Sequence, residues 1–206
     1  APCKRRSKKK EEFKENLTDI VSYLEPNDIL LFQDESTFFQ NGLPRKVWAK
    51  KGTKPELPIY GTHAKLNVFG AINSLTGQSH FQYINNLDAD CYLKFLKAIL
   101  KEYPDSRKIY LVIDNAPAHK SKKVFDFVSS AKGNRLELVC LPPYSPDLNP
   151  IEIVWREVKK DVVYNTFYPL FDDFKTALTD SLKNFAPSRI KSICGIDKFR
   201  QEVLVN

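Results

Sequence analysis

With 206 residues, of which 42% are hydrophobic and 28% charged, the chain is long enough to bury a core and has the composition of a globular protein. These figures exclude a chain that is disordered throughout, and no apolar run approaches the roughly 18 residues of a transmembrane helix. The net charge of +7 permits a nucleic acid as partner without proving one.

The positive charge is concentrated at the start of the chain. Six lysines and arginines lie within residues 1–10, and the remainder is close to neutral. This basic segment is either a solvated tail or a contact for phosphates. Residues 11–24 then place apolar side chains at helical spacing, which predicts a short amphipathic helix that docks on the elements that follow.

Strands dominate the next part of the chain. The run I-L-L-F-Q-D-E-S-T predicts a buried central strand over 29–37, with Asp34 at its end. Three more strands are expected because turn signals separate short apolar runs. They span 45–51, 65–77 and 78–86, and the last two form a hairpin.

Helices and strands alternate in the second half. The run K-I-Y-L-V-I-D-N predicts another buried strand over 108–115, which ends in Asp114. Around it we expect helices over 89–103, 120–131 and 171–185, a strand over 136–141 and an irregular proline-rich loop over 142–150. This order predicts an α/β fold with a mixed central β-sheet flanked by helices.

A further helix begins at Asn149-Pro150 and runs to about Lys160. Asn149 is a favoured N-cap residue, and Pro150 suits the first helical position. Glu152 stands where a capping box has its acidic partner. The sequence therefore predicts that Glu152 lies in the first turn of this helix.

Three acidic residues occupy positions that converge in such a fold. Asp34 and Asp114 follow apolar strands and Glu152 opens a helix, and strand ends and helix starts meet at one edge of a sheet. Carboxylates that meet repel one another unless cations are present, and Mg²⁺ or Mn²⁺ prefers such oxygen ligands. Each residue also has a plainer interpretation: the start of a loop for Asp34, an Asx turn for Asp114 and a capping box for Glu152.

Three sequence blocks resemble the signature blocks of DDE transposases of the mariner superfamily, closest to its bacterial and archaeal insertion-sequence branch. The blocks are F-Q-D-E-S, I-D-N-A-P-A-H and L-P-P-Y-S-P-D-L-N-P-I-E-I-V-W. The similarity covers about residues 29–160. Thirty-seven residues separate Asp114 from Glu152, a spacing of the kind this superfamily shows, although the mariner branch proper has Asp as its third acid.

This resemblance implies an RNase H-like fold and an enzyme that moves DNA by cutting and pasting. Water would attack a phosphodiester at the transposon end, and the freed 3′ hydroxyl would then attack target DNA, typically at a TA dinucleotide. By the same resemblance, Asp34, Asp114 and Glu152 are the catalytic metal ligands for two Mg²⁺ or Mn²⁺ ions. The implied partners are the double-stranded DNA of the transposon ends and of the target, bound by a homodimer.

Several neighbouring residues are candidates for supporting roles. Glu35, Asn115, His119 and Asn149 are expected to surround the metal ligands, each with the alternative of a plain surface, turn or cap residue. Trp155 is expected in the core. Candidate DNA contacts combine basic and aromatic side chains, although such residues also keep an exposed edge soluble. They are Arg45, Lys46, Trp48, Lys50, Lys51, Lys54 and Tyr144.

The chain divides by these patterns into three parts. We expect a basic tail and linker helix over 1–26, an RNase H-like DDE catalytic domain over 27–165, and a C-terminal helical extension over 166–206 packed on it. Four cysteines without a C-x-x-C pair argue against structural zinc and fit a reducing, intracellular compartment, the cytoplasm or nucleoid in a prokaryote or the nucleus in a eukaryote.

Two alternatives to an active transposase domain remain. One is a domesticated or non-catalytic DNA-binding protein derived from a transposase, and the other is a different RNase H-like nuclease, such as a resolvase. A DNA-binding module normally needs two or three helices, and residues 1–26 offer at most one. We therefore expect the chain by itself to lack selective binding to transposon ends.

Overall fold

The structure is a computed structural model that describes residues 2–43, 45–46, 48–53, 56 and 61–195, except for the side chains of residues 2–6. A five-stranded sheet forms its centre, in the order β3-β2-β1-β4-β5. Neighbouring pairs are antiparallel from β3 to β1 and parallel from β1 to β5, which confirms the predicted mixed sheet. The strands are β1 (Ile29–Phe39), β2 (Lys65–Ile72), β3 (Ser79–Ile84), β4 (Ile109–Ile113) and β5 (Leu136–Cys140).

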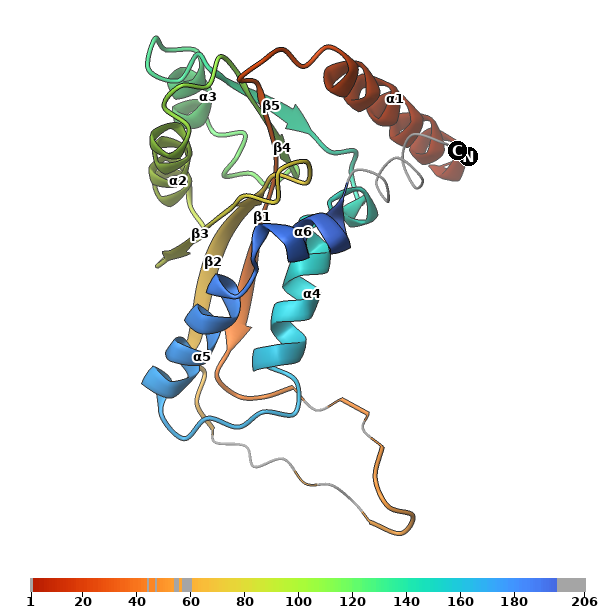
Figure 1. Cartoon of the computed structure of the whole chain (residues 1–206), viewed down its shortest axis with the longest axis vertical. Coiled ribbons are helices and arrows are strands. Elements are labelled where there is room, and N and C mark those ends of the chain that lie inside the picture. The colour runs from red at the N-terminus through yellow and green to blue at the C-terminus, as the bar shows by residue number, and fades with distance from the viewer. Residues whose placement is uncertain (1, 44, 47, 54–55, 57–60, 196–206) are drawn as a thin grey trace.

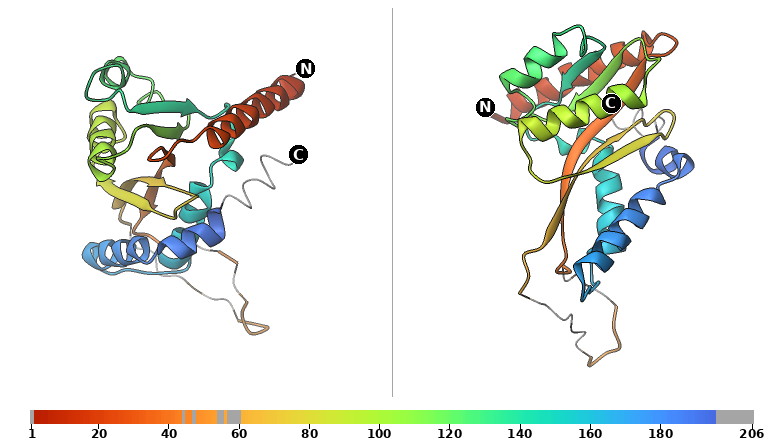
Figure 2. Two further views of the ribbon diagram at one scale, coloured as in Figure 1. Left: turned by 45° about the horizontal axis from the view of Figure 1, so that its top comes forward. Right: turned by 90° about the vertical axis from the view of Figure 1, so that its left-hand side faces the viewer.

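Helices cover both faces of this sheet (Figures 1 and 2). On one face lie α2 (Ala89–Glu102) and α3 (Lys122–Val128). On the other face lie α1 (Pro2–Ser22), α4 (Ile151–Val162), α5 (Phe171–Lys183) and α6 (Pro187–Cys194). A short 3₁₀ turn, Pro146–Leu148, precedes α4.

The core is divided by the sheet into two apolar clusters. Phe32, Phe38 and Trp155 belong to the cluster under α1, α4, α5 and α6. Phe69 and Phe95 belong to the cluster under α2 and α3. Because β1 and β2 are covered on both faces, their side chains are largely buried whichever way they point.

The predicted strand over 45–51 is wrong for the residues that the structure describes. Residues 45–46 and 48–50 have no regular secondary structure, and a turn begins at residue 51. The antiparallel partner of β1 is β2 itself, and the described residues of this segment pair with none of the five strands. Its side chains also lack an apolar face to bury, and Trp48 is fully exposed.

The N-terminal helix is longer than the apolar spacing predicted. It begins at Pro2 and includes the basic segment that was expected as a tail, because lysine, arginine and glutamate are good helix formers. The side chains of Phe13 and Leu17 are buried in the core and attach this helix to it. Lys10 Nζ lies 2.6 Å from a carboxylate oxygen of Asp147 in the loop before α4. The sequence patterns also missed α6.

Among the described helices, none is both long enough and apolar enough to cross a membrane. The longest of them, α1, carries lysine and glutamate along its length.

The turn between β2 and β3 makes a testable close contact with α6. Gly77 has φ +79°, and a Cβ added there would lie 2.1 Å from the carbonyl oxygen of Pro187. We expect Gly77→Ala to lower the free energy of unfolding by about 2–4 kcal/mol, through left-handed strain and a backbone clash. Gly52→Ala is the matched control because Gly52 has φ +90° but open space around it. Urea unfolding that shows equal losses for both variants would contradict the clash.

Candidate active site

Asp34 lies in the middle of β1. The sequence had predicted it at the end of a strand, and that position is wrong. Parallel pairing between β1 and β4 stops at Phe32 and Val112, but β2 continues to pair with β1 as far as Phe39. The polar half of β1 therefore keeps a hydrogen-bonded neighbour on one side only. This places Asp34 just beyond the point at which β4 leaves the sheet.

Asp114 is the first residue after β4. Its Oδ1 accepts a hydrogen bond of 2.8 Å from the backbone N–H of Ala116, so the Asx turn that the sequence allowed is present. The amide of the next residue, Asn115, donates to the carbonyl oxygen of Leu141 beyond β5. The chain that leaves β4 is thereby tied to the chain that leaves β5, and Asp114 is held at this edge.

Glu152 lies in the first turn of α4, as predicted, but it does not complete a capping box. The backbone N–H of Asn149 donates to Pro146 instead, at 2.9 Å. Asn149 uses its side-chain amide to donate to the carbonyl oxygen of Gln33 on β1, also at 2.9 Å. This buried bond fixes the start of α4 beside Asp34 and leaves the Glu152 carboxylate free to face the cleft.

The three predicted acids line one cleft of about 470 Å³. Each comes from a different element: Asp34 from β1, Asp114 from the end of β4 and Glu152 from α4. The remaining wall is the proline-rich loop before α4, together with Asn115 and Asn149. The structure thus brings together in space three residues that are far apart in the sequence.

Contact with His119 lowers the pKa of Asp114, whereas the pKa values of the other two acids in this cleft are raised. Burial raises the pKa of Asp34 to about 8, and the charges of Glu152, Glu35 and Asp114 add to the rise. Desolvation also raises the pKa of Glu152. In the described part of the chain neither Asp34 nor Glu152 has an ion-pair partner. Such a carboxylate cluster fits a hard divalent cation.

Trp155 is a core residue, as predicted, and it also supports the cleft. Its indole Nε1 donates a hydrogen bond of 3.1 Å to Oδ2 of Asp34. To reach this carboxylate, the ring lies over β2 at Gly70, the residue that pairs directly with Asp34. A Cβ at Gly70 would lie 2.6 Å from Cη2 of the indole. Sequence reasoning missed this role, although a glycine inside a strand is a known signal of close approach.

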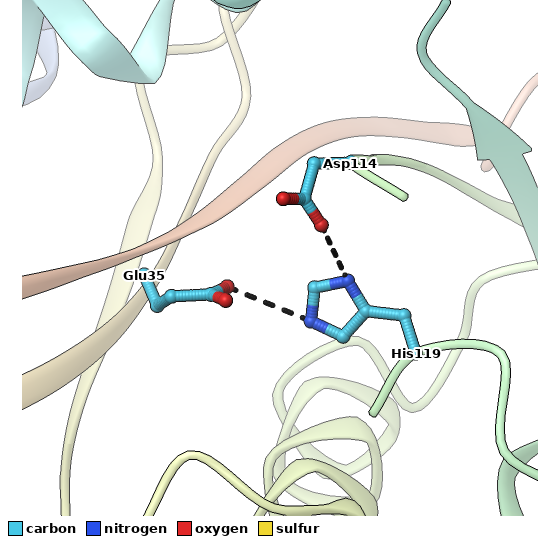
Figure 3. Close-up of side chains that lie close together, drawn as sticks. All are labelled: Glu35, Asp114 and His119. Atoms are coloured by element: carbon cyan, nitrogen blue, oxygen red, sulfur yellow. Dashed lines mark ion pairs between the residues drawn. The ribbon is translucent and has the colours of Figure 1, made fainter. Parts of the chain in front are cut away.

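A second group of side chains meets Asp114 from the other side of the sheet. Glu35, Asp114 and His119 each place one potential ligand atom within 4.8 Å of the other two (Figure 3). Glu35 follows Asp34 in an extended strand and so points to the opposite face. The nitrogen atoms of His119 face both carboxylates. Of the predicted supporting residues, Glu35 and His119 thus form a pair of their own.

The candidate DNA contacts do not gather at the cleft. Arg45 stacks on the ring of Tyr164, 4.4 Å from its centroid. Trp48 is fully exposed, Lys46, Lys50 and Lys51 are exposed as well, and Lys54 lies outside the described residues. Of the described residues in this set, Tyr144 alone lines the cleft. It is 83% exposed and has φ +56°, a strained conformation for a large side chain.

The raised pKa of Asp34 predicts how the stability of the metal-free protein depends on pH. The unfolded chain loses this proton near pH 4 and the folded chain near pH 8, so folding stability is lost as pH rises through that window. We expect Asp34→Asn to remove this dependence and to raise the unfolding free energy at pH 8, on the order of a few kcal/mol. Urea unfolding in EDTA at pH 5 and pH 8 measures it.

Glu157→Gln serves as the control for that measurement. A hydrogen bond from Lys160 lowers the pKa of Glu157, so neutralising this side chain removes a favourable contact. We expect no gain in stability at pH 8. A wild-type protein with equal stability at both pH values would contradict the assignment of a buried, unbalanced Asp34.

The contact between Gly70 and Trp155 gives a second prediction. Gly70→Ala overpacks the sheet under the indole, so we expect a loss of about 1–3 kcal/mol in unfolding free energy. Trp155→Phe shortens the opposing ring, and the double variant is expected to recover part of that loss. Denaturant unfolding of the two single variants and the double variant measures this coupling, and strictly additive losses would show that the two residues do not press on each other.

Two sequence relatives of the chain are proteins of transposable elements. The family model for the DDE superfamily endonucleases matches residues 29–175. A 39 kDa protein of insertion element IS630 from Shigella sonnei is 23% identical over 136 residues, which are 66% of this chain and 39% of that protein. The Tc3 transposase of Caenorhabditis elegans is 29% identical over 150 residues, 71% of this chain and 39% of that protein. The chain thus spans 39% of the length of each of these two relatives.

Solved structures agree in fold. The Mos1 transposase, in a paired-end complex with the left transposon end, matches with a TM-score of 0.75 and 16% identity, over 97% of this chain and 60% of that one. The catalytic domain of the Mos1 mariner transposase matches with a TM-score of 0.68 and 15% identity, over 97% and 91% of the two chains. The predicted RNase H-like fold is confirmed. Since the family model also spans most of the sequence, the chain belongs to the DDE superfamily endonucleases, as its three sequence blocks had predicted.

Proposed function

We propose that this chain is the catalytic domain of a cut-and-paste DNA transposase, which hydrolyses phosphodiesters and transfers DNA strands with divalent metal ions. The observation that carries the proposal is the cleft in which Asp34, Asp114 and Glu152 converge with unbalanced charge. Membership of the DDE endonucleases and similarity to the Tc3 transposase support it.

The three acids are proposed as ligands of two Mg²⁺ or Mn²⁺ ions. Mos1 paired-end complexes have been solved with Mg and with Mn, and the excess charge around Asp34 favours cations of this kind. Bound there, such ions would neutralise charge on a phosphodiester and activate the attacking oxygen. The protein's own contribution is to hold the carboxylates in place: Asn149 fixes the start of α4, and the Asx turn fixes Asp114.

Double-stranded DNA is the proposed partner. Mos1 has been captured in a paired-end complex with a transposon end and in a strand transfer complex, and the same partners are proposed here, with a homodimer bridging two ends. Tyr144, at the rim of the cleft, is positioned to meet a DNA strand. Exposed lysines on α1 and on the segment around Trp48 could contact phosphates further away.

The three-part division of the chain is retained within this proposal. Residues 27–165 would form the catalytic domain, with 1–26 and 166–206 as flanking parts. Phe13 and Leu17 of α1 join the same apolar cluster as Phe174 and Leu178 of α5. These contacts indicate that the flanking helices stabilise the catalytic domain and are not separate modules.

Metal-dependent DNA cleavage tests the proposal. With Mn²⁺ or Mg²⁺, we expect the chain to nick a labelled duplex or a supercoiled plasmid, and EDTA to abolish nicking. Asp114→Asn and Glu152→Gln remove proposed metal ligands. Each is expected to lower the nicking rate by more than the roughly 10–100-fold that residues behind metal ligands contribute.

The matched control is Glu157→Gln, which neutralises another acid on α4 that pairs with Lys160 and does not line the cleft. Its nicking rate should equal that of the wild type. Unchanged cleavage by Asp114→Asn or Glu152→Gln would refute the assigned site. Metal-dependent DNA binding without any cleavage would instead favour a non-catalytic, transposase-derived DNA-binding protein.

A further inference from the structure

His119 is a buried imidazole between two carboxylates. It follows β4 by a short turn and is 3% exposed. Its Nδ1 lies 2.9 Å from Oδ1 of Asp114, and its Nε2 lies 3.5 Å from Oε2 of Glu35. Figure 3 shows the ring lying between these two side chains, one from the end of β4 and one from β1.

Besides these contacts, the buried side chain of Gln33 lies close to the Glu35 carboxylate. Both nitrogens of His119 and Oε2 of Glu35 are buried without a hydrogen bond of regular geometry, although each imidazole nitrogen lies beside a carboxylate oxygen. Unsatisfied buried polar atoms are destabilising and call for a functional reason. The ring of Tyr92 on α2 packs 4.1 Å from the imidazole centroid and restricts where the imidazole can turn.

Asp114 uses its two oxygens differently. Oδ1 is engaged by the N–H of Ala116 and lies against His119. The carboxylate also lines the cleft shared with Asp34 and Glu152, whereas Glu35 and His119 do not. Asp114 therefore stands between the cleft and the buried pair behind it.

We propose that Glu35 and His119 form a relay that positions Asp114 for the divalent cation, without either of them binding the ion. The inference rests on the proposed function, because it assigns Asp114 as a metal ligand. Carboxylates that bind metals are commonly held by hydrogen-bond partners behind them. Here His119 holds Oδ1, and Glu35 holds the far side of the imidazole.

Direct metal binding by His119 is the competing arrangement, since one ligand atom from each of the three residues lies within 4.8 Å of the others. Two features favour the relay. Mg²⁺ and Mn²⁺ prefer oxygen ligands, and the imidazole does not reach the cleft in which unbalanced charge collects. The proton shared between His119 and Glu35 can lie on Nε2 or on the Glu35 carboxylate. In both cases the imidazole keeps its Nδ1–H, which points toward Asp114, so the relay does not depend on where the shared proton lies.

Side-chain geometry provides variants that separate positioning from simple packing. In His119→Asn the amide nitrogen takes the place of Nδ1 and can still donate to Asp114. In His119→Gln the amide lies near Nε2, so the contact with Glu35 survives and that with Asp114 is lost. We expect His119→Asn to bind Mn²⁺ nearly as well as the wild type, and His119→Gln and His119→Ala to bind about 10–100-fold more weakly.

Titration of the whole chain with Mn²⁺, followed by the EPR signal of the free ion, measures these affinities. The matched control is His80→Asn, because His80 is a partly buried histidine on the same face, packed on Phe95 and 4.0 Å from Glu102. It should leave Mn²⁺ binding unchanged. Pulsed EPR of the bound ion should show no directly coordinated nitrogen. Equal affinities for all His119 variants, or a coordinated nitrogen that disappears in His119→Ala, would overturn the relay.

A metal-free measurement distinguishes failure of the relay from failure of the proposed function. In EDTA, the losses in Tm of His119→Gln and Asp114→Ala should be non-additive: the double variant should lose less than the sum of the two single losses, because both variants break the same contact. Absence of Mn²⁺ binding to the wild type would count against the proposed function. Additive Tm shifts would overturn the relay whatever the metal result.

Discussion

The strongest constraint on this structure is the repulsion between the carboxylates that meet beside the end of β4. Burial disfavours the charged form of Asp34 and raises its pKa to about 8, and the charges of Glu152 and Asp114 add to this rise. The fold tolerates the repulsion because apolar clusters on both faces of the sheet hold the strands in place. The remaining excess of negative charge is what makes the cleft attractive to divalent cations.

Two buried side chains with N–H groups contact the two aspartates from opposite faces of the sheet. Trp155 donates to Asp34 from the face covered by α4, and His119 lies against Asp114 from the face covered by α2 and α3. Neither donor brings the positive charge of lysine or arginine into the cleft. Each can therefore fix the direction of a carboxylate while leaving its charge available to a metal ion.

The sequence predicted most of this arrangement wherever the signal was local. Asp114 and Glu152 could be placed because an apolar strand precedes one and Asn149-Pro150 precedes the other. The mid-strand position of Asp34 depends on pairing with Gly70 of β2, 36 residues further on, which no local pattern reveals. The same is true of Gly70 beneath the indole. The false strand over 45–51 followed from a short apolar run between turn signals, in a segment whose described residues have no partner in the sheet.

The helix α4 explains why distant packing matters to the cleft. Glu152 and Trp155 lie on the same helix, so any shift of α4 along β1 would move one acid and the donor of another together. Asn149 opposes such a shift through its bond to Gln33. At the same point Cys194 of α6 contacts the carbonyl oxygen of Pro150, at 3.2 Å. The C-terminal helices therefore contribute to the geometry of the site, because they help to set the position of α4, which carries Glu152.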